Sequence, residues 1–168
     1  PAAGGAAIEM EPEGHSGDVR ALVTFVEPAT GALRVATASW DETIRVWDAE
    51  TGGALLVIDV GSYVTVLAFF LDQATGAPRL ACGAMYEEKV RVFDPVAGGE
   101  ALLVIDVGSD VRALAFSADP ATGELRLACG CEDSKLRVFD PVAGGEALVV
   151  IDVGSTVWAL AVFADPVT

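Results

Sequence analysis

The sequence predicts an all-β protein assembled from successive four-stranded antiparallel sheets. One observation is an internal repeat, because the twelve residues RVFDPVAGGEAL occur at 91–102 and again at 137–148. A second is the pattern within each unit, where short runs rich in Val, Ile, Leu and Phe alternate with polar residues and are separated by Gly, Pro and Asp. Such alternation between turn residues is typical of strands joined by hairpins. No window shows the period or the caps of a helix.

The repeat has a clear frame and length. Its units begin with variants of one segment, namely GDVRALVTF at 17–25, SYVTVLAFF at 62–70, SDVRALAFS at 109–117 and STVWALAVF at 155–163. The aromatic residue that closes each complete unit is Trp47, Phe93 or Phe139, so the period is 46 residues. A period of this length indicates a repeat architecture in which each unit is one small sheet.

Each strand of a unit has its own signal, which is clearest in the third unit. The segment VRALAF at 111–116 is apolar almost throughout, as expected of an innermost strand with a sheet packed on each side. A Gly in the following DPATG supplies the positive φ that a tight loop needs. The remaining strands are expected in LRLACG at 125–130, KLRVFD at 135–140 and ALVVIDV at 147–153. A sheet that is apolar on both faces needs another layer on each side, and the neighbouring units are its natural cover.

Composition narrows the classes of partner. Ten Lys and Arg stand against 25 Asp and Glu, which gives a net charge of −15 that repels nucleic acid and anionic lipid surfaces. Apolar runs such as 66–71 are far shorter than the roughly 18 residues of a membrane-spanning helix. The N-terminal PAAGGAAIEMEPEG lacks the basic and leucine-rich regions of a secretory signal. We therefore expect a soluble, cytoplasmic protein.

The cysteines favour the same compartment. Cys82, Cys129 and Cys131 are odd in number and lie in strand-like segments, which suits reduced thiols. Cys129 and Cys131 are two residues apart with no second Cys or His pair at ligand spacing, so no metal site is expected. No phosphate-binding loop, calcium loop or G-x-S-x-G nucleophile motif occurs, so neither a cofactor nor a catalytic centre is expected.

The first unit carries a specific resemblance. Gly14 and His15 precede its first strand, Ser39-Trp40-Asp41 follows its second, and Trp47-Asp48 closes it. The chain thereby resembles the WD-repeat β-propeller family, whose blades are four-stranded antiparallel sheets. The resemblance implies a structural hydrogen-bond network of His15, Asp41, Trp47 and a strand hydroxyl, either Ser39 or Thr37.

Later units depart from that network. Ser62 and Ser109 stand where the His is expected, and Phe93 and Phe139 replace the Trp. Glu87 takes the turn position of the second unit, while Asp133 keeps it in the third. Since Phe has no indole N–H to donate, the second and third units are expected to depend more on apolar packing. Because the resemblance implies a place for His15 in this network, His15 is expected to be a buried structural residue rather than a catalytic one.

The family's strand order predicts where the blades lie. Three blades are expected at approximately 18–60, 63–107 and 110–153, so that residues 1–168 form a partial propeller. Residues 5–12 resemble an outermost strand without its blade, and 156–163 an innermost strand whose blade stops at Thr168. Because propellers close with about four to eight blades, three blades make an incomplete arc with open apolar faces. We expect either a piece of a longer polypeptide, which the stop inside a loop favours, or self-association that completes the ring.

The resemblance implies a function in binding proteins. Family members most often bind partners on the face where the inner strands begin and the second strands end. Candidate residues on this face are those at which the units differ, namely Asp18, Arg20, Trp40, Tyr63, Thr65, Tyr86, Asp110, Arg112, Glu132 and Trp158. Exposed Trp, Tyr and Arg dominate interface energetics, although variation at loop ends also arises by drift.

Three functions are compatible with the sequence. A non-catalytic protein-interaction scaffold accounts best for the repeats, the missing catalytic set and the variable aromatic residues. A purely structural repeat segment of a large assembly accounts for the repeats alone. An enzyme with a site in the central channel is least favoured, because the predicted channel-lining strands are mostly Val, Ala and Leu.

Overall fold

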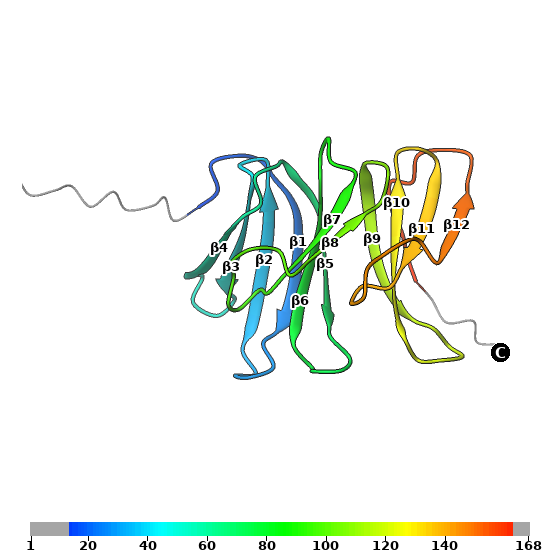
Figure 1. Cartoon of the computed structure of the whole chain (residues 1–168). Helices are drawn as coiled ribbons and strands as arrows, with labels where there is room; N and C mark the ends of the chain where they lie inside the picture. Colours follow the sequence, from blue (N-terminus) through cyan, green and yellow to red (C-terminus); the bar gives the residue numbers. More distant parts are fainter. Residues whose placement is uncertain (1–13, 163–168) are drawn as a thin grey trace, which may run out of the picture.

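The computed structural model describes residues 14–162, which contain twelve strands and no helix (Figure 1). The strands form three separate four-stranded antiparallel sheets, here called blades A, B and C. Blade A comprises β1 (Val19–Val26), β2 (Leu33–Ser39), β3 (Thr43–Asp48) and β4 (Ala54–Asp59). Blade B comprises β5 (Val64–Leu71), β6 (Pro78–Ala84), β7 (Lys89–Phe93) and β8 (Leu103–Asp106). Blade C comprises β9 (Val111–Ala118), β10 (Leu125–Cys131), β11 (Lys135–Phe139) and β12 (Val149–Asp152).

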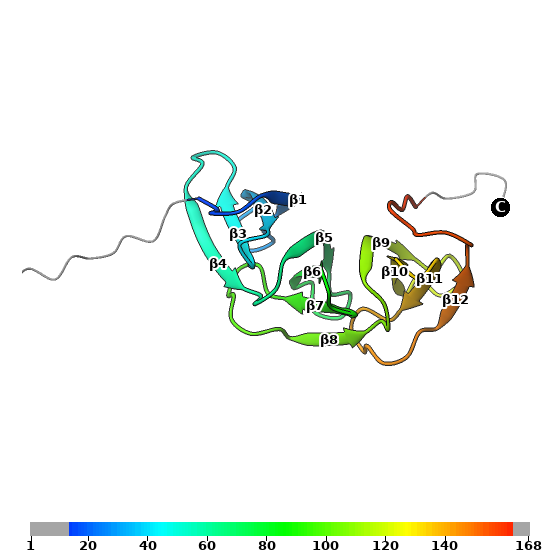
Figure 2. The same cartoon turned by 90° about the horizontal axis from the view of Figure 1, so that it is seen from above.

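The three blades follow one another along an open arc. Seen from above in Figure 2, the first strands β1, β5 and β9 lie on the concave side, and the last strands β4, β8 and β12 lie on the convex side. Within each blade the strands pair in sequence order, which is the meander of a propeller blade. The prediction of an all-β fold, with four-stranded blades arranged as an incomplete propeller, is confirmed.

Each blade has two apolar faces. The forward face is the one directed at the next blade in the sequence, and the backward face is directed at the preceding blade. Between A and B, the forward face of A (Phe25, Ile44, Val46, Ile58) packs in one buried cluster with the backward face of B (Val64, Leu67, Leu80, Phe93). Between B and C, the forward face of B (Phe70, Val90, Val92, Ile105) packs with the backward face of C (Val111, Leu127, Cys129, Phe139). The core of the protein therefore lies between blades.

A β-bulge at the start of every inner strand turns apolar residues towards both neighbours. In blade B the pairing of β5 with β6 shifts between Val64 and Val66, and blades A and C have equivalent shifts. Because the bulge breaks strict alternation, Val64 packs towards blade A and Val66 towards blade C. The residue between them stays outside the ladder.

The repeated RVFDPVAGGEAL segment forms a turn held by its own aspartate. One oxygen of Asp94, Oδ1, accepts the backbone N–H groups of Val96 at 2.8 Å and Ala97 at 2.9 Å. Asp140 makes the same two bonds in blade C. In each turn the Asp side chain accepts the backbone N–H groups of the residues two and three positions later. These N–H groups have no partner in the sheet, so the Asp satisfies them. The repeated segment is therefore framework.

The two strands expected outside the three blades, at 5–12 and 156–163, are not found in the described structure. Residues 5–12, expected as an outermost strand, lie outside the described residues. The inner strand expected at 156–163 is wrong over its described part, because residues 156–162 form no strand. Val157 donates its N–H to the carbonyl of Cys131 at 3.1 Å, but no second strand of a further blade lies alongside in the described chain to continue a ladder.

Among residues 14–162, no helix is both long enough and apolar enough to cross a membrane.

Candidate interaction face and its framework

Blade A contains a chain of hydrogen bonds that begins at Trp47. The indole Nε1–H of Trp47 donates to Thr37 Oγ1 at 2.8 Å, and Thr37 Oγ1 lies 2.7 Å from His15 Nε2. His15 Nδ1 lies 2.8 Å from Asp41 Oδ2. Since Thr37 accepts from Trp47 and donates its own proton to Nε2, the network assigns the Nδ1–H tautomer to His15. Both imidazole nitrogens are engaged, and the His15 side chain is 4% exposed.

The strand hydroxyl in this chain is that of Thr37, not that of Ser39. Both residues belong to β2 and lie two positions apart, so they face the same side of the strand. Ser39 is fully buried at the end of β2, where its Oγ accepts the backbone N–H of Asp41 at 3.0 Å. Of the two hydroxyls that the sequence left open, Thr37 joins the rings, and Ser39 supports the turn that carries Asp41.

Asp41 is the ionised end of the network. Burial raises the pKa of its carboxyl group, but hydrogen bonds from Thr43 and His15 and from the backbone N–H of Ser16 outweigh burial and lower the pKa to about 2. Its side chain is 7% exposed. A buried carboxylate with this many donors ties the segment before β1 to the β2–β3 turn.

In blades B and C the acidic residue of the corresponding turn is paired with an arginine. Arg91 forms a bidentate pair with Glu87, with Nη2 3.0 Å from Oε1, and Ser62 Oγ donates to the same carboxylate at 2.5 Å. Arg137 and Asp133 form the equivalent pair, at 2.9 and 2.6 Å. Each arginine lowers the pKa of its acid partner. The sequence analysis did not identify these pairs, since an acid in the turn followed four residues later by Arg occurs in all three blades, including Asp41 and Arg45 of blade A.

The upper face of the arc, at the top of Figure 1, carries the loops before the inner strands and the β2–β3, β6–β7 and β10–β11 turns. Arg20 and Arg112 occupy the bulge positions of β1 and β9, outside the regular ladder. The Arg20 guanidinium lies 4.6 Å from the centre of the Trp40 ring, and that of Arg112 lies 5.5 Å from the centre of the Trp158 ring. Two predicted face residues are thus joined to two others by cation–π contacts.

Arg112 also faces two carboxylates. It pairs with Glu132 through a short contact and lies 3.6 Å from Asp110. Asp110 in turn accepts the backbone N–H of Tyr86 at 3.2 Å. These contacts connect the upper loops of blades B and C, so the predicted residues Tyr86, Asp110, Arg112, Glu132 and Trp158 form one neighbourhood.

Tyr86 is the most exposed aromatic residue on this face, at 80%. The β6–β7 turn is longer by one residue than its counterparts, because six residues separate the paired Gly83 and Val90, whereas five separate Ala38 from Ile44. Met85, not Tyr86, makes the backbone bond that Trp40 makes in blade A. Tyr86 has a φ of 62°, and Glu42 and Ser134 in the corresponding turns of blades A and C also have positive φ, so this conformation is a feature of the turn.

The remaining predicted face residues lie at the same end of the blades. Trp40 is 36% exposed, Tyr63 45% and Trp158 70%. Asp18 is exposed and Thr65 half-buried, with Thr65 at the bulge of β5. The structure thus places every predicted face residue along the upper edge of the arc, with cation–π pairs at both ends and Tyr86 between them.

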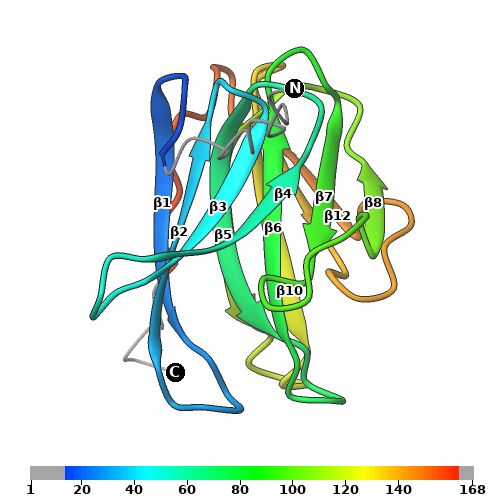
Figure 3. The ribbon, with the colours of Figure 1, turned by 90° about the vertical axis from the view of Figure 1, so that its left-hand side faces the viewer.

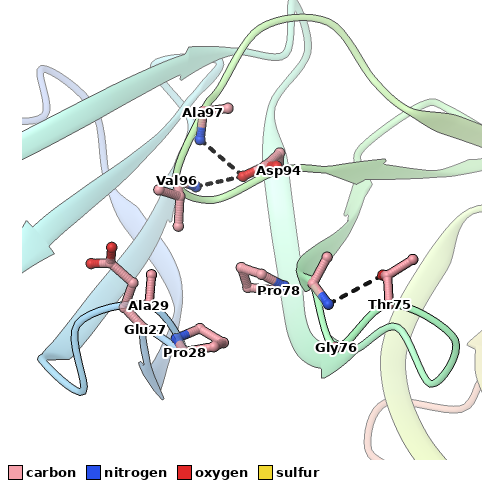
Figure 4. Close-up of a pocket in the computed structure, with 10 residues that line it drawn as sticks. Glu27, Pro28, Ala29, Thr75, Gly76, Pro78, Asp94, Val96 and Ala97 are labelled. Carbon is pink, nitrogen blue, oxygen red and sulfur yellow. Dashed lines mark hydrogen bonds between the residues drawn. The ribbon is translucent and has the colours of Figure 1, made fainter.

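A cleft of about 450 Å³ opens on the opposite, lower side between blades A and B (Figure 4). Pro28 from the β1–β2 turn lies on one side of it and Pro78 at the start of β6 on the other. Its carboxylates are already engaged, since Glu27 pairs with Arg34 and Asp94 accepts backbone N–H groups. The cleft therefore presents an apolar surface without an activated nucleophile.

The equivalent gap between blades B and C is bridged. Gln73, which takes the position of Pro28, donates to the carbonyl of Gly123 at 2.9 Å and accepts the N–H of Leu125 at 3.0 Å. At the first junction, Pro28 has no amide to offer and Pro78, at the position of Leu125, has no N–H. The cleft is therefore a local difference between the copies.

The cysteines and acidic residues form no metal or reactive site in residues 14–162. No group of three or more His, Cys, Asp or Glu side chains in this range has an arrangement that could hold a metal ion. All three cysteines are buried free thiols. Burial raises the pKa of Cys82 to about 12 and raises that of Cys129 as well, so both remain protonated.

Comparison with known proteins agrees with this architecture. The family model "WD domain, G-beta repeat" matches residues 8–48 and 102–140. No curated protein matches the sequence. Among solved structures, the computationally designed protein Ika4 is 30% identical with a TM-score of 0.68, over 92% of this chain and 85% of Ika4.

Two larger structures are also similar. The computationally designed protein Ika8 is 30% identical with a TM-score of 0.65, over 91% of this chain, which spans 42% of Ika8. Sqt1 from Saccharomyces cerevisiae has a TM-score of 0.71 at 17% identity, over 89% of this chain and 42% of Sqt1, and so shows the fold alone. With its repeated blades, its His15–Asp41–Trp47 framework and these matches, the chain belongs to the WD40-repeat family.

Proposed function

We propose that this protein is a non-catalytic scaffold that binds a protein partner on its upper face. WD40 repeats are in general protein-interaction scaffolds. The observation that carries the proposal is the row of exposed aromatic residues at positions where the blades differ, with Tyr86 80% and Trp158 70% exposed. Large aromatic side chains that remain exposed on a rigid frame are the usual anchors of interfaces.

Tyr86 is the best candidate anchor. It stands on the longer turn, its backbone is held by Asp110 of the next blade, and its ring is nearly free of protein contacts. Because the backbone of Tyr86 is already held, a partner that covers the ring does not have to order the turn as well. Trp40 and Trp158 flank it, each with an arginine beside its ring.

The described residues offer little support for an enzyme. His15 has both ring nitrogens engaged and is 4% exposed. Burial holds the thiols of Cys82 and Cys129 in the protonated form. The cleft of about 450 Å³ lies among turn residues on the lower side. The buried reduced thiols also favour the cytoplasm as the proposed location.

We further propose that additional blades complete the arc, supplied either by a longer polypeptide or by other copies of this chain. Three blades are fewer than the about four to eight of a closed propeller. A purely structural role within a large assembly is the second candidate, favoured by the near-identity of the framework segments.

Site-specific photocrosslinking separates a binding face from a structural array. A benzoylphenylalanine is placed at Tyr86, at Trp158 or, as a control, at Val104, an exposed position on the outer strand β8. We expect the first two positions to crosslink the same protein partner in a cell extract and the control to give no such product. If all three positions give the same products, or if none reacts, the upper face is not a specific binding site.

A further inference from the structure

The two junctions inside the chain are built alike. Ile58 of blade A and Ile105 of blade B are each 1% exposed on their forward faces. Val64 of blade B and Val111 of blade C are 0% and 1% exposed on their backward faces. Every forward face that meets a backward face is therefore closed and dry at these positions.

The two outer faces of the arc carry the same residue types but are open. Ile151, the equivalent of Ile58 and Ile105, is 48% exposed on the forward face of blade C. Val19, the equivalent of Val64 and Val111, is 53% exposed on the backward face of blade A, and Leu22 there is 60% exposed. Figure 3 views the molecule from this side, with the strands of blade A in front. Apolar side chains exposed in such a row mark an interaction surface.

One pair of positions shows how the open faces match each other. At the first junction Phe25 stacks on Phe69 with ring centroids 4.7 Å apart, and at the second Phe70 packs on Phe116 at 4.5 Å. The equivalent forward position in blade C is Ser117, and the equivalent backward position in blade A is Thr24. Both partners thus change together from aromatic rings to hydroxyl groups. Two hydroxyl groups can hydrogen-bond to each other, whereas a hydroxyl group is a poor partner for a ring.

We infer that two copies of this chain dock head to tail, with the backward face of blade A of one copy on the forward face of blade C of the other. The inference deepens the proposed completion of the arc and identifies the surfaces that meet. Each copy contributes one face of each kind, so two copies related by a two-fold axis bury both. Six blades lie within the range in which propellers close.

The segment at 154–162 competes for part of this surface. Val157 lies against Gly130, where an added Cβ would come within 2.9 Å of the Val157 Cβ. Val111 lies against Gly83 in the same manner, at 3.1 Å. In the docked pair, Val19 of the second copy takes the place of Val157, so the cation–π contact of Trp158 with Arg112 is present only in the undocked chain. Residues 156–162 form no strand, so few backbone bonds oppose their displacement. At the position equivalent to Thr24 this segment has Val162, which has no hydroxyl group to offer Ser117.

Sedimentation equilibrium of the full 168-residue chain tests the inference. It is run over a range of concentrations at high ionic strength, which screens the charge of −15 on each copy. We expect a reversible species of twice 17.3 kDa. Leu22→Lys and Ile151→Lys, on the two docking faces, should each raise the dissociation constant at least about tenfold. The matched control Val104→Lys alters an equally exposed side chain, 48%, on blade B and should leave the constant unchanged.

A variant with the opposite effect guards against general destabilisation. Val157→Asp loosens the competing segment from Gly130 and should tighten association. A chain that stays monomeric at all concentrations, or a dimer that the Leu22 and Ile151 variants do not weaken, overturns the inference. Crosslinking of a partner at Tyr86 is a separate result, since Tyr86 lies on neither docking face.

Discussion

Blade A and blades B and C hold the same turn in two chemically different ways. In blade A the turn acid Asp41 is bound by His15, which is linked through Thr37 to Trp47. In blades B and C the turn acid is bound by an arginine of the following strand, as in the pair of Asp133 with Arg137. The first arrangement joins four elements through side chains that are nearly dry, and the second joins neighbours in one hairpin at the protein surface.

The two arrangements indicate which interactions stabilise each blade. The network of blade A ties the segment before β1 to two strands and a turn, so its loss leaves several buried groups without partners. An arginine pair across a hairpin is local and partly hydrated, and its net contribution is small. Blades B and C therefore depend more on their packed faces, where Phe93 and Phe139 are 2% and 1% exposed.

Removing the charge of Asp41 should have the largest effect on stability. Asp41→Asn places an amide NH₂ group among the donors of Thr43, His15 and Ser16, so at least one of them loses its acceptor. We expect the free energy of unfolding to fall by about 3 kcal/mol in denaturant titrations. The control Glu50→Gln, on an exposed turn, should change it by less than about 0.5 kcal/mol. Equal effects of the two substitutions would contradict the network.

The pH dependence of stability should follow from the same carboxylate. Its pKa is about 2 in the folded chain against 3.8 in the reference state, so its contribution is complete above about pH 4 and is lost as the pH falls towards 2. The wild type should lose on the order of 2 kcal/mol more than Asp41→Asn over this interval. Thermal or urea unfolding at several pH values measures the difference, and parallel curves for the two proteins would show that Asp41 is not stabilised by the fold.

The hydroxyl groups of Thr37 and Ser39 should contribute unequally to the free energy of unfolding. Thr37→Val keeps the shape of the side chain but leaves the Trp47 indole N–H and His15 Nε2 without partners, at a cost of about 2 kcal/mol. Ser39→Ala removes one bond to the backbone of Asp41 and should cost about 1 kcal/mol. Chemical denaturation of both variants decides between them, and a larger loss for Ser39→Ala would reverse the assignment.

The arginine pairs should have a smaller effect that depends on salt. Arg91→Met and Arg137→Met each remove a partly exposed pair with a carboxylate. We expect losses of about 0.5–1 kcal/mol at low ionic strength that shrink when salt is added. The effect of Thr37→Val, which involves neutral groups, should not change with salt. If salt affects all three variants alike, the distinction between the blades fails.

Much of this fold was predictable from the sequence, because the unit repeats and turn residues separate its strands. His15, Asp41 and Trp47 were identifiable from their family pattern. The choice of Thr37 over Ser39 was not, since two residues on one side of a strand have the same pattern and only the position of the Trp47 ring separates them. No strand forms over residues 156–162, because a strand also needs a partner to pair with.

The location of the interaction face was predictable from the sequence, but the contacts of its residues were not. The variable positions around the upper loops indicated it, and the aromatic residues there are exposed. The extra residue in the β6–β7 turn shifts Tyr86 out of the position of Trp40, and only the hydrogen bond of Met85 to the carbonyl of Tyr63 reveals this. The cation–π pairs arise because bulges turn Arg20 and Arg112 out of the ladder, and a bulge leaves little trace in an alternating sequence.

The face residues should have the smallest effect on stability and the largest on binding, in contrast to the framework of blade A. The most direct test is a triple variant, Trp40→Ala, Tyr86→Ala and Trp158→Ala, compared with Thr37→Val. Binding is measured by surface plasmon resonance against the partner crosslinked at Tyr86, together with the free energy of unfolding. We expect the triple variant to unfold within about 1 kcal/mol of the wild type but to lose at least about a hundredfold in affinity. A triple variant that binds as tightly as the wild type would show that the upper face is not the binding site.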